Sequence, residues 1–177
     1  MKKLLAILMT LCLLCAAAAC AESQLPEPFT LRDGICFGMN LSEVTALEKV
    51  RYHDLDVEDT SGPVSFTELE YEQMRENDVP CEIKYLFVDD GLVVVKFNYE
   101  TRFISYARLK DELTALYGEA AVLDVPALGN AVYAIDDDGR PERQAESWTV
   151  GDTLIVLELD EDDIDLTYLD LAAPYLR

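Results

Sequence analysis

The sequence predicts an α+β fold in which an antiparallel sheet carries its helices on one face. Two observations support this prediction. Short segments in which apolar and polar residues alternate, as in strands, follow one another without intervening helices in two parts of the chain. Each of these parts begins with a single segment of helical periodicity. The lack of crossover helices argues against a doubly wound nucleotide-binding fold.

The first predicted helix begins within ICFGMNLSEVTALE, residues 35–48. Asn40 is a good N-cap, and Glu43 stands three residues later, which is the spacing of a capping box. The preceding residues 29–37 are expected to form a short strand. A phosphate-binding loop needs more than one glycine and a following lysine, so the lone Gly38 indicates a strand that leads into a helix.

The clearest hairpin lies in EIKYLFVDDGLVVVKFNYE, residues 82–100. Apolar and polar residues alternate on both sides of Asp90-Gly91, a dipeptide typical of tight hairpin turns. The preceding segment at 65–72 shows an imperfect alternation and predicts another strand of the same sheet.

The second predicted helix lies in SYARLKDELTALYG, residues 105–118, where Ser105 can cap the start and Gly118 suits the position after the end. Residues 131–142 then predict a strand and a turn, and residues 146–170 predict three short strands.

The two parts of the chain resemble each other in the order of their elements. Residues 29–177 are therefore expected to form a single α+β domain with two related halves, 29–100 and 101–177, each of one helix followed by about four strands. Identity between the halves is slight, so an origin by duplication is a hypothesis.

The first 21 residues have the form of a secretory signal peptide, with Lys2 and Lys3 before an apolar stretch that ends in small residues. The stretch is shorter than the roughly 20 apolar residues of a spanning helix. We therefore expect an exported protein, extracellular or associated with the cell envelope, whose residues 22–28 form an extended lead-in.

Two kinds of processing fit the end of this signal. Ala19-Cys20-Ala21 is an A-x-A cleavage site, which would release a secreted chain. Alternatively, the residues around Cys20 resemble a bacterial lipobox, and Cys20 would then carry a lipid anchor. The lipobox usually has a larger aliphatic residue where Ala17 stands, so the pattern favours plain secretion.

The chain is strongly acidic, with a formal net charge of −21. Removal of residues 1–21 removes two lysines and no acid, which leaves −23. Such a charge repels phosphate backbones, so we expect no nucleic-acid binding. Solubility outside the cell is one explanation of the charge, and a basic partner or bound divalent cations are the alternative. Because 50% of the residues are hydrophobic, the chain is expected to fold despite this charge.

Cys36 and Cys81 are the two cysteines outside the signal region. In an exported protein they could form a disulfide that closes a loop of about 45 residues and contributes about 4 kcal/mol. Two free thiols are the alternative, since cysteine also behaves as a small hydrophobic residue. The redox compartment permits both arrangements.

The residues do not predict a catalytic, cofactor or metal site. His53 is the only histidine, and it has neither a recognisable nucleophile motif nor close zinc-ligand spacing around it. The acidic runs at 136–139 and 160–165 do not fit a calcium-binding EF-hand. A small secreted hydrolase that uses two carboxylates and a calcium-responsive surface protein remain the alternatives to a non-enzymatic protein.

Aromatic residues on the predicted strands suggest a binding surface. A sheet with helices on one face leaves the other face open, and tyrosine or tryptophan there would favour protein binding. The candidates are Tyr85, Tyr99, Trp148 and Tyr168, and the alternative for each of them is a place in the core between the sheet and the helices.

FGMNLSEVTALE, residues 37–48, resembles the Gly-Met-[Ser/Thr]-x-x-Glu/Gln-Val start of repeats in small exported bacterial proteins. These are the SmpA/BamE outer-membrane lipoproteins and the β-lactamase inhibitor proteins, and the latter consist of tandem helix-plus-sheet units. Asn40 stands where these repeats usually have Ser or Thr. The resemblance implies a non-enzymatic, protein-binding role at the cell surface or outside the cell, with an unknown protein partner.

Overall fold

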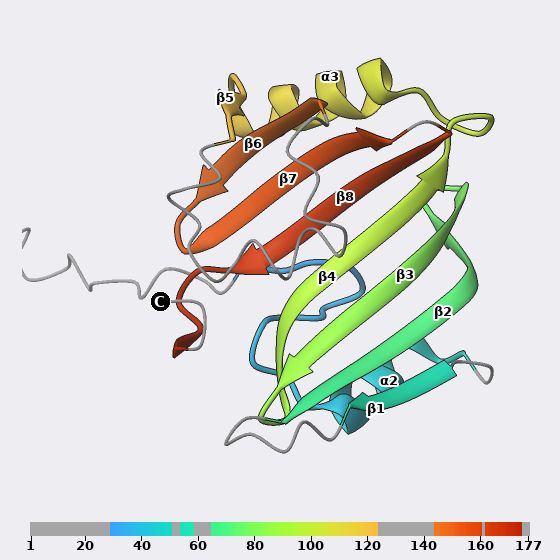
Figure 1. Ribbon diagram of the computed structural model, residues 1–177, viewed down its shortest axis with the longest axis vertical. Coiled ribbons are helices and arrows are strands. Elements are labelled where there is room, and N and C mark those ends of the chain that lie inside the picture. Colours follow the sequence, from blue (N-terminus) through green and yellow to red (C-terminus); the bar gives the residue numbers. More distant parts are fainter. Residues whose placement is uncertain (1–28, 51–53, 59–64, 124–143, 161, 175–177) are drawn as a thin grey trace, which may run out of the picture.

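The computed structural model describes residues 29–50, 54–58, 65–123, 144–160 and 162–174. These residues form an α+β fold, as predicted (Figure 1). The elements in chain order are α2 (Leu41–Glu48), β1 (Asp54–Glu58), β2 (Phe66–Glu76), β3 (Val79–Val88), β4 (Gly91–Glu100), α3 (Tyr106–Tyr117), β5 (Ala121–Val122), β6 (Gln144–Val150), β7 (Thr153–Asp160) and β8 (Asp163–Asp170).

All the strands belong to one antiparallel sheet with the order β1-β2-β3-β4-β8-β7-β6-β5. Within each half of the chain, consecutive strands are neighbours in the sheet. The last strand of each half lies at the centre, where β4 pairs with β8 from Val94↔Leu169 to Glu100↔Asp163. The element order α-β-β-β-β therefore occurs twice, and the two halves share a continuous sheet (Figure 1).

Both predicted helices begin at the predicted caps. The Asn40 side chain accepts a hydrogen bond from the Glu43 amide at 3.0 Å, and the Glu43 carboxylate accepts one from the Asn40 amide at 2.9 Å, which completes the capping box. At the start of α3, the Ser105 hydroxyl accepts a hydrogen bond from the Arg108 amide at 3.3 Å. These bonds satisfy amides that have no partner within the helix.

The expected strand at 29–37 is wrong. The chain turns back on itself there, because Asp33 and Gly34 both have positive φ, and only the isolated bridge Thr30↔Cys36 remains. Gly38, at φ 81°, begins the connection to α2, and its amide donates to the Leu92 carbonyl at 2.9 Å. This glycine therefore serves the turn that ties the N-terminal segment to β4.

One face of the sheet and both helices form the main core. Val44 of α2 and Leu109 and Leu113 of α3 lie in the same buried cluster, so the two helices cover the same face. The strands contribute alternate residues to this cluster, among them Leu69, Tyr71, Ile83, Tyr85, Phe97, Tyr99, Ile155, Leu157, Ile164 and Leu166.

A smaller apolar cluster lies on the opposite face, towards one end of the central strands. Its buried residues are Val88, Val93, Val94, Leu154, Val156, Leu169 and Ala173. Adjacent residues such as Val94 and Val95 thus belong to different clusters, which explains why the sequence of β4 reads as a nearly continuous apolar run. None of the described helices is long and apolar enough to cross a bilayer.

The capping box generates a prediction about stability. Asn40→Ala should lower the free energy of unfolding by about 1 kcal/mol, because the Glu43 amide at the start of α2 loses its side-chain acceptor. Asn40→Asp keeps an acceptor at the same place and should stay close to the wild type. Urea denaturation of the purified variants measures the difference, and equal losses for both substitutions would contradict a role for the cap.

Candidate functional site

The four aromatic candidates for an open-face binding surface lie on the helix side of the sheet, so of the two alternatives the structure has the one in which they fill the core. Tyr85, Tyr99 and Trp148 are at most 3% exposed, and Tyr168 is half-buried against the same cluster. The alternation along each strand is as expected, but it points these side chains towards the helices. Trp148 donates from Nε1 to the Gly118 carbonyl at 2.8 Å, which ties β6 to the end of α3.

Of the two alternatives for the cysteines, the structure has the free thiols. Cys36 is half-buried near Thr30, and Cys81 is buried on β3. Burial raises the pKa of the Cys81 thiol to about 11, so this thiol stays protonated at neutral pH.

Several predictions fall on residues that the structure does not describe. These are the signal peptide 1–21 with Cys20, the lead-in 22–28, His53, and the strand and turn expected at 131–142 with the acidic run at 136–139. Within the described part of the chain, no group of three or more His, Cys, Asp and Glu side chains is arranged to hold a metal ion.

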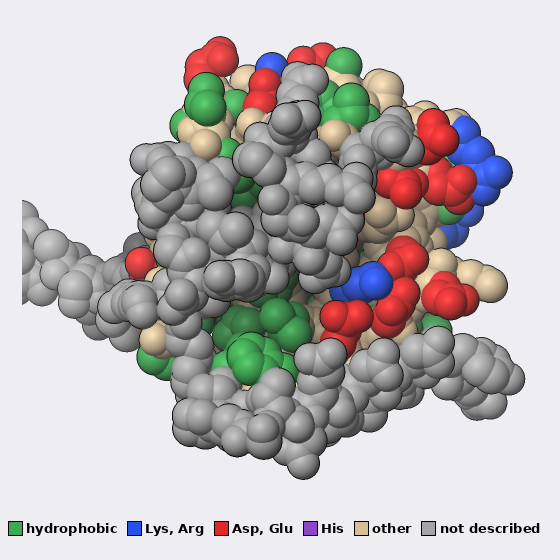
Figure 2. Space-filling view, viewed as in Figure 1, with side chains coloured by type: hydrophobic (Ala, Val, Ile, Leu, Met, Phe, Trp, Pro, Cys, Tyr) green, Lys and Arg blue, Asp and Glu red, His purple; other side chains and the backbone are tan. Residues whose placement is uncertain are grey.

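The face of the sheet opposite the helices carries a dense set of charges. On β2, β3, β4 and β8, every second residue points away from the main core, and many of these residues are charged. We call this set the acidic face; it consists of Glu68, Glu70, Glu82, Lys84, Lys96, Asn98, Glu100, Asp163 and Asp165. Figure 2 shows acidic side chains gathered around a basic one on this side of the molecule, beside an apolar area.

Two lysines lie opposite each other at the centre of the acidic face, and carboxylates surround them. Lys84 and Lys96 are cross-strand neighbours. Lys84 Nζ lies 3.3 Å from Glu70, 3.3 Å from Glu82 and 3.9 Å from Glu68. Lys96 Nζ lies 2.9 Å from Asp165, which also accepts a hydrogen bond from Asn98 at 2.9 Å.

Carboxylates outnumber the lysines on this face, so its charge is negative. Burial alone would lower the pKa of Lys84, but Glu82 and Glu70 raise it above its ordinary value. The pKa of Glu82 is raised by partial burial and by its hydrogen bond with Glu70. The pKa shifts of Lys84 and Glu82 thus reflect partial burial together with the closely spaced carboxylates around Lys84.

At one end of the acidic face lies a hollow of about 440 Å³. It lies beside an irregularity in the pairing of β2 with β3, between Tyr71 and Met74. Its lining includes Met74, Pro80, Glu82, Asn98, Glu100 and Phe103. Phe103 is 44% exposed, and the Arg102 guanidinium lies 4.6 Å from the centre of its ring. The acidic face therefore ends at an exposed aromatic side chain.

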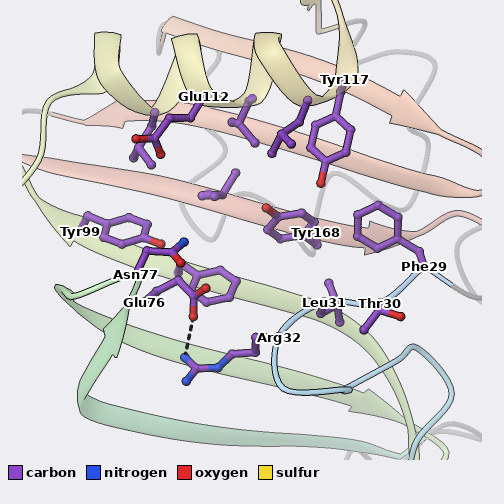
Figure 3. A pocket seen from close by; sticks show the side chains of 15 residues that line it. Phe29, Thr30, Leu31, Arg32, Glu76, Asn77, Tyr99, Glu112, Tyr117 and Tyr168 are labelled. Atoms are coloured by element: carbon purple, nitrogen blue, oxygen red, sulfur yellow. Dashed lines mark ion pairs between the residues drawn. The ribbon is translucent and has the colours of Figure 1, made fainter.

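A separate cleft lies on the helix side of the sheet, between the N-terminal segment, α3 and the central strands (Figure 3). It has a volume of about 130 Å³ and is lined mainly by aromatic and leucine side chains. Arg32, Glu76, Asn77 and Glu112 add charged and polar groups to its wall, as Figure 3 shows.

Arg32 anchors a buried group of charges beside this cleft. Its side chain is 11% exposed and lies 3.3 Å from the carboxylate of Glu48 and 3.2 Å from that of Glu76. Tyr85 donates a hydrogen bond to Glu48. Burial alone would lower the pKa of Arg32, but Glu48, Tyr85 and Glu76 raise it. Opposite charges that are largely shielded from solvent thereby hold together the N-terminal segment, α2 and β2.

Sequence reasoning missed this charged group, although one signal was present. Glu48 stands four residues after Val44, so it lies on the buried face of α2. A buried carboxylate needs a cationic partner, and Arg32 in the preceding segment supplies it. The remaining contacts, from Tyr85 and Glu76, come from strands that no local pattern connects to α2.

Comparison of the chain with protein-family models, with curated proteins and with solved structures finds no match. Any function assigned to the candidate sites therefore rests on their geometry and charge.

The ion pairs of Arg32 generate a second prediction. Arg32→Met should lower the free energy of unfolding by about 3 kcal/mol, because Glu48 would be left buried without a cation. Arg102→Met removes the same charge from a side chain that is 68% exposed, and should change stability by less than about 1 kcal/mol. Urea denaturation of both variants tests this difference, and similar losses would show that the buried pair has no special role.

Proposed function

We propose that this chain is an exported, non-enzymatic interaction module whose acidic face binds a basic surface of another protein. The observation that carries the proposal is the set of carboxylates around Lys84 and Lys96 on the sheet face opposite the helices. Such a surface attracts a positively charged partner over several ångströms and repels anionic ones.

The shape of this region also favours a protein partner. The acidic face is a broad surface over several strands, and the hollow at its end adds the exposed ring of Phe103. Protein interfaces combine such a charged rim with an aromatic contact that is buried on binding. A basic side chain from the partner would compete with Lys84 for the carboxylates around it.

The alternative of a carboxylate hydrolase is less well supported. A hydrolase of this kind requires a concave site with two carboxylates, one of which has a raised pKa. The cleft meets part of this requirement through Glu76, and the hollow at the end of the acidic face does so through Glu82. In each case the carboxylate of raised pKa lies near a cation, Glu76 at 3.2 Å from Arg32 and Glu82 at 3.3 Å from Lys84. A cation at that distance favours the ionised form and offsets part of the rise in pKa that burial causes.

The sequence at 1–21 and the resemblance of residues 37–48 to repeats of exported binding proteins support the same proposal. A partner at the cell surface or in the medium would meet the acidic face after export.

Capture of partners from the envelope and culture medium of the producing organism tests the proposal. The bait is the purified protein in its natural processed form, immobilised and used with calcium and with chelator. We expect a saturable basic protein partner whose retention falls with salt and does not depend on calcium. Glu68→Gln/Glu70→Gln should weaken its binding at least about threefold, because two carboxylates of the acidic face lose their charge.

The matched control is Asp111→Asn/Glu119→Gln, which removes the same charge from exposed positions on and just after α3. This control should bind as the wild type does. Equal weakening by both double variants would indicate only a general charge effect and would contradict the acidic face as the site. Capture that requires calcium would favour the calcium-responsive alternative.

A further inference from the structure

The residues that line the cleft of Figure 3 combine aromatic rings with charged groups, which core packing alone does not require. Aromatic rings surround it: Phe29 lies 6.3 Å from Tyr117 and 5.9 Å from Tyr168, and Phe97 lies 5.9 Å from Tyr168, measured between ring centres. These rings come from the N-terminal segment, α3, β4 and β8, so all four elements contribute to one aromatic enclosure.

Tyrosine hydroxyl groups from three elements lie in the wall of this enclosure. Tyr99, Tyr117 and Tyr168 all line the cleft, and within the described part of the chain their hydroxyls make no hydrogen bond. Figure 3 shows Tyr117 pointing from α3 towards Tyr168. Burial raises the pKa of Tyr99 and Tyr168, so both remain neutral phenols whose rings and oxygens are partly negative.

The charges at the wall favour a cation. Glu76 and Glu112 both line the cleft, and Arg32 is the cation among the lining residues. Arg32 is already matched, because Asp33, Glu48 and Glu76 all lie within 3.6 Å of its guanidinium. Glu112 is paired as well, because Arg108 lies 2.9 Å from its carboxylate. The four carboxylates of Asp33, Glu48, Glu76 and Glu112 still exceed the two arginines in charge, and the whole chain is strongly negative.

We propose that this cleft binds a small organic cation with a quaternary or alkylated ammonium group. Aromatic faces attract such a cation through their quadrupole, and a carboxylate at the rim adds a charge contact. The volume of about 130 Å³ suits a compact ligand, since a cavity of about 150 Å³ holds benzene. Leu116, which is 71% exposed at the edge of the cleft, gives the ligand an apolar entrance.

This inference is independent of the proposed protein-binding role, because the cleft and the acidic face lie on opposite sides of the sheet. A ligand in the cleft would contact both halves of the chain, through β4 and Phe29 on one side and α3 and β8 on the other.

Titration calorimetry with choline as the probe tests the inference. Its neutral isostere 3,3-dimethylbutan-1-ol and the anion 3,3-dimethylbutyrate have similar bulk and serve as ligand controls. We expect saturable choline binding, with the isostere at least about threefold weaker and the anion weaker still. Equal binding of choline and its isostere, or no choline binding at tens of millimolar, would overturn the proposal.

Variants locate the site within the protein. Tyr117→Leu should weaken choline binding about three- to thirtyfold, and Tyr117→Phe, which keeps the ring, should stay within about twofold of the wild type. Glu112→Gln should weaken it as well, whereas Asp111→Asn, which removes an exposed carboxylate outside the cleft on the same helix, should not. Choline binding that is unchanged in both Tyr117→Leu and Glu112→Gln would exclude this cleft as the site.

Discussion

The rest of the structure depends on the pairing of β4 with β8. The backbone ladder from Val94↔Leu169 to Glu100↔Asp163 joins two units, each of one helix and four strands, into one sheet. Because side chains alternate along each strand, the register of this pairing decides which residues of both halves share a face. It puts Phe97 beside Leu166 on the helix side and Asn98 beside Asp165 on the open side. Without the pairing, each half would expose an unpaired strand edge.

The two faces that result have different chemistry. The helix side encloses aromatic rings and the buried charges around Arg32, and the open side presents the crowded carboxylates around Lys84 and Lys96. A fold of this size could have neutralised its surface with more basic residues, yet the chain has 35 acidic and 14 basic residues. The excess makes any association with a basic partner fast and sensitive to salt.

Local patterns were enough to predict much of the fold. The capping box at Asn40, the cap at Ser105 and the hairpin within residues 82–100 depend on residues close in sequence, and the structure confirms them. The turn of the hairpin lies one residue earlier than expected, because Asp89 and Asp90 adopt the positive φ angles and Gly91 already pairs with Val88. The strand expected at 29–37 failed because positive φ at Asp33 and Gly34, which the apolar pattern does not reveal, reverses the chain.

The candidate sites were harder to predict, because alternation does not say which face the helices cover. Tyr85 and Tyr99 alternate with Lys84 and Asn98, and either set could have faced outwards. Both helices pack on the side of the aromatic residues, so the aromatic set faces the core. The cleft could not be predicted from the sequence, because its residues come together only in the folded chain. They include Phe29, Glu76, Tyr117 and Tyr168.

Hydrogen exchange of the native protein tests most directly whether the β4–β8 ladder makes the two halves one structural unit. The amides to follow are those of Val95, Phe97, Leu166 and Tyr168, together with amides of β3 and β7 on either side. We predict that all of them exchange only through global unfolding, with the free energy that urea denaturation gives. Exchange of the β7 and β8 amides at a clearly lower free energy than those of β3 and β4 would show that the halves open separately and would contradict the account.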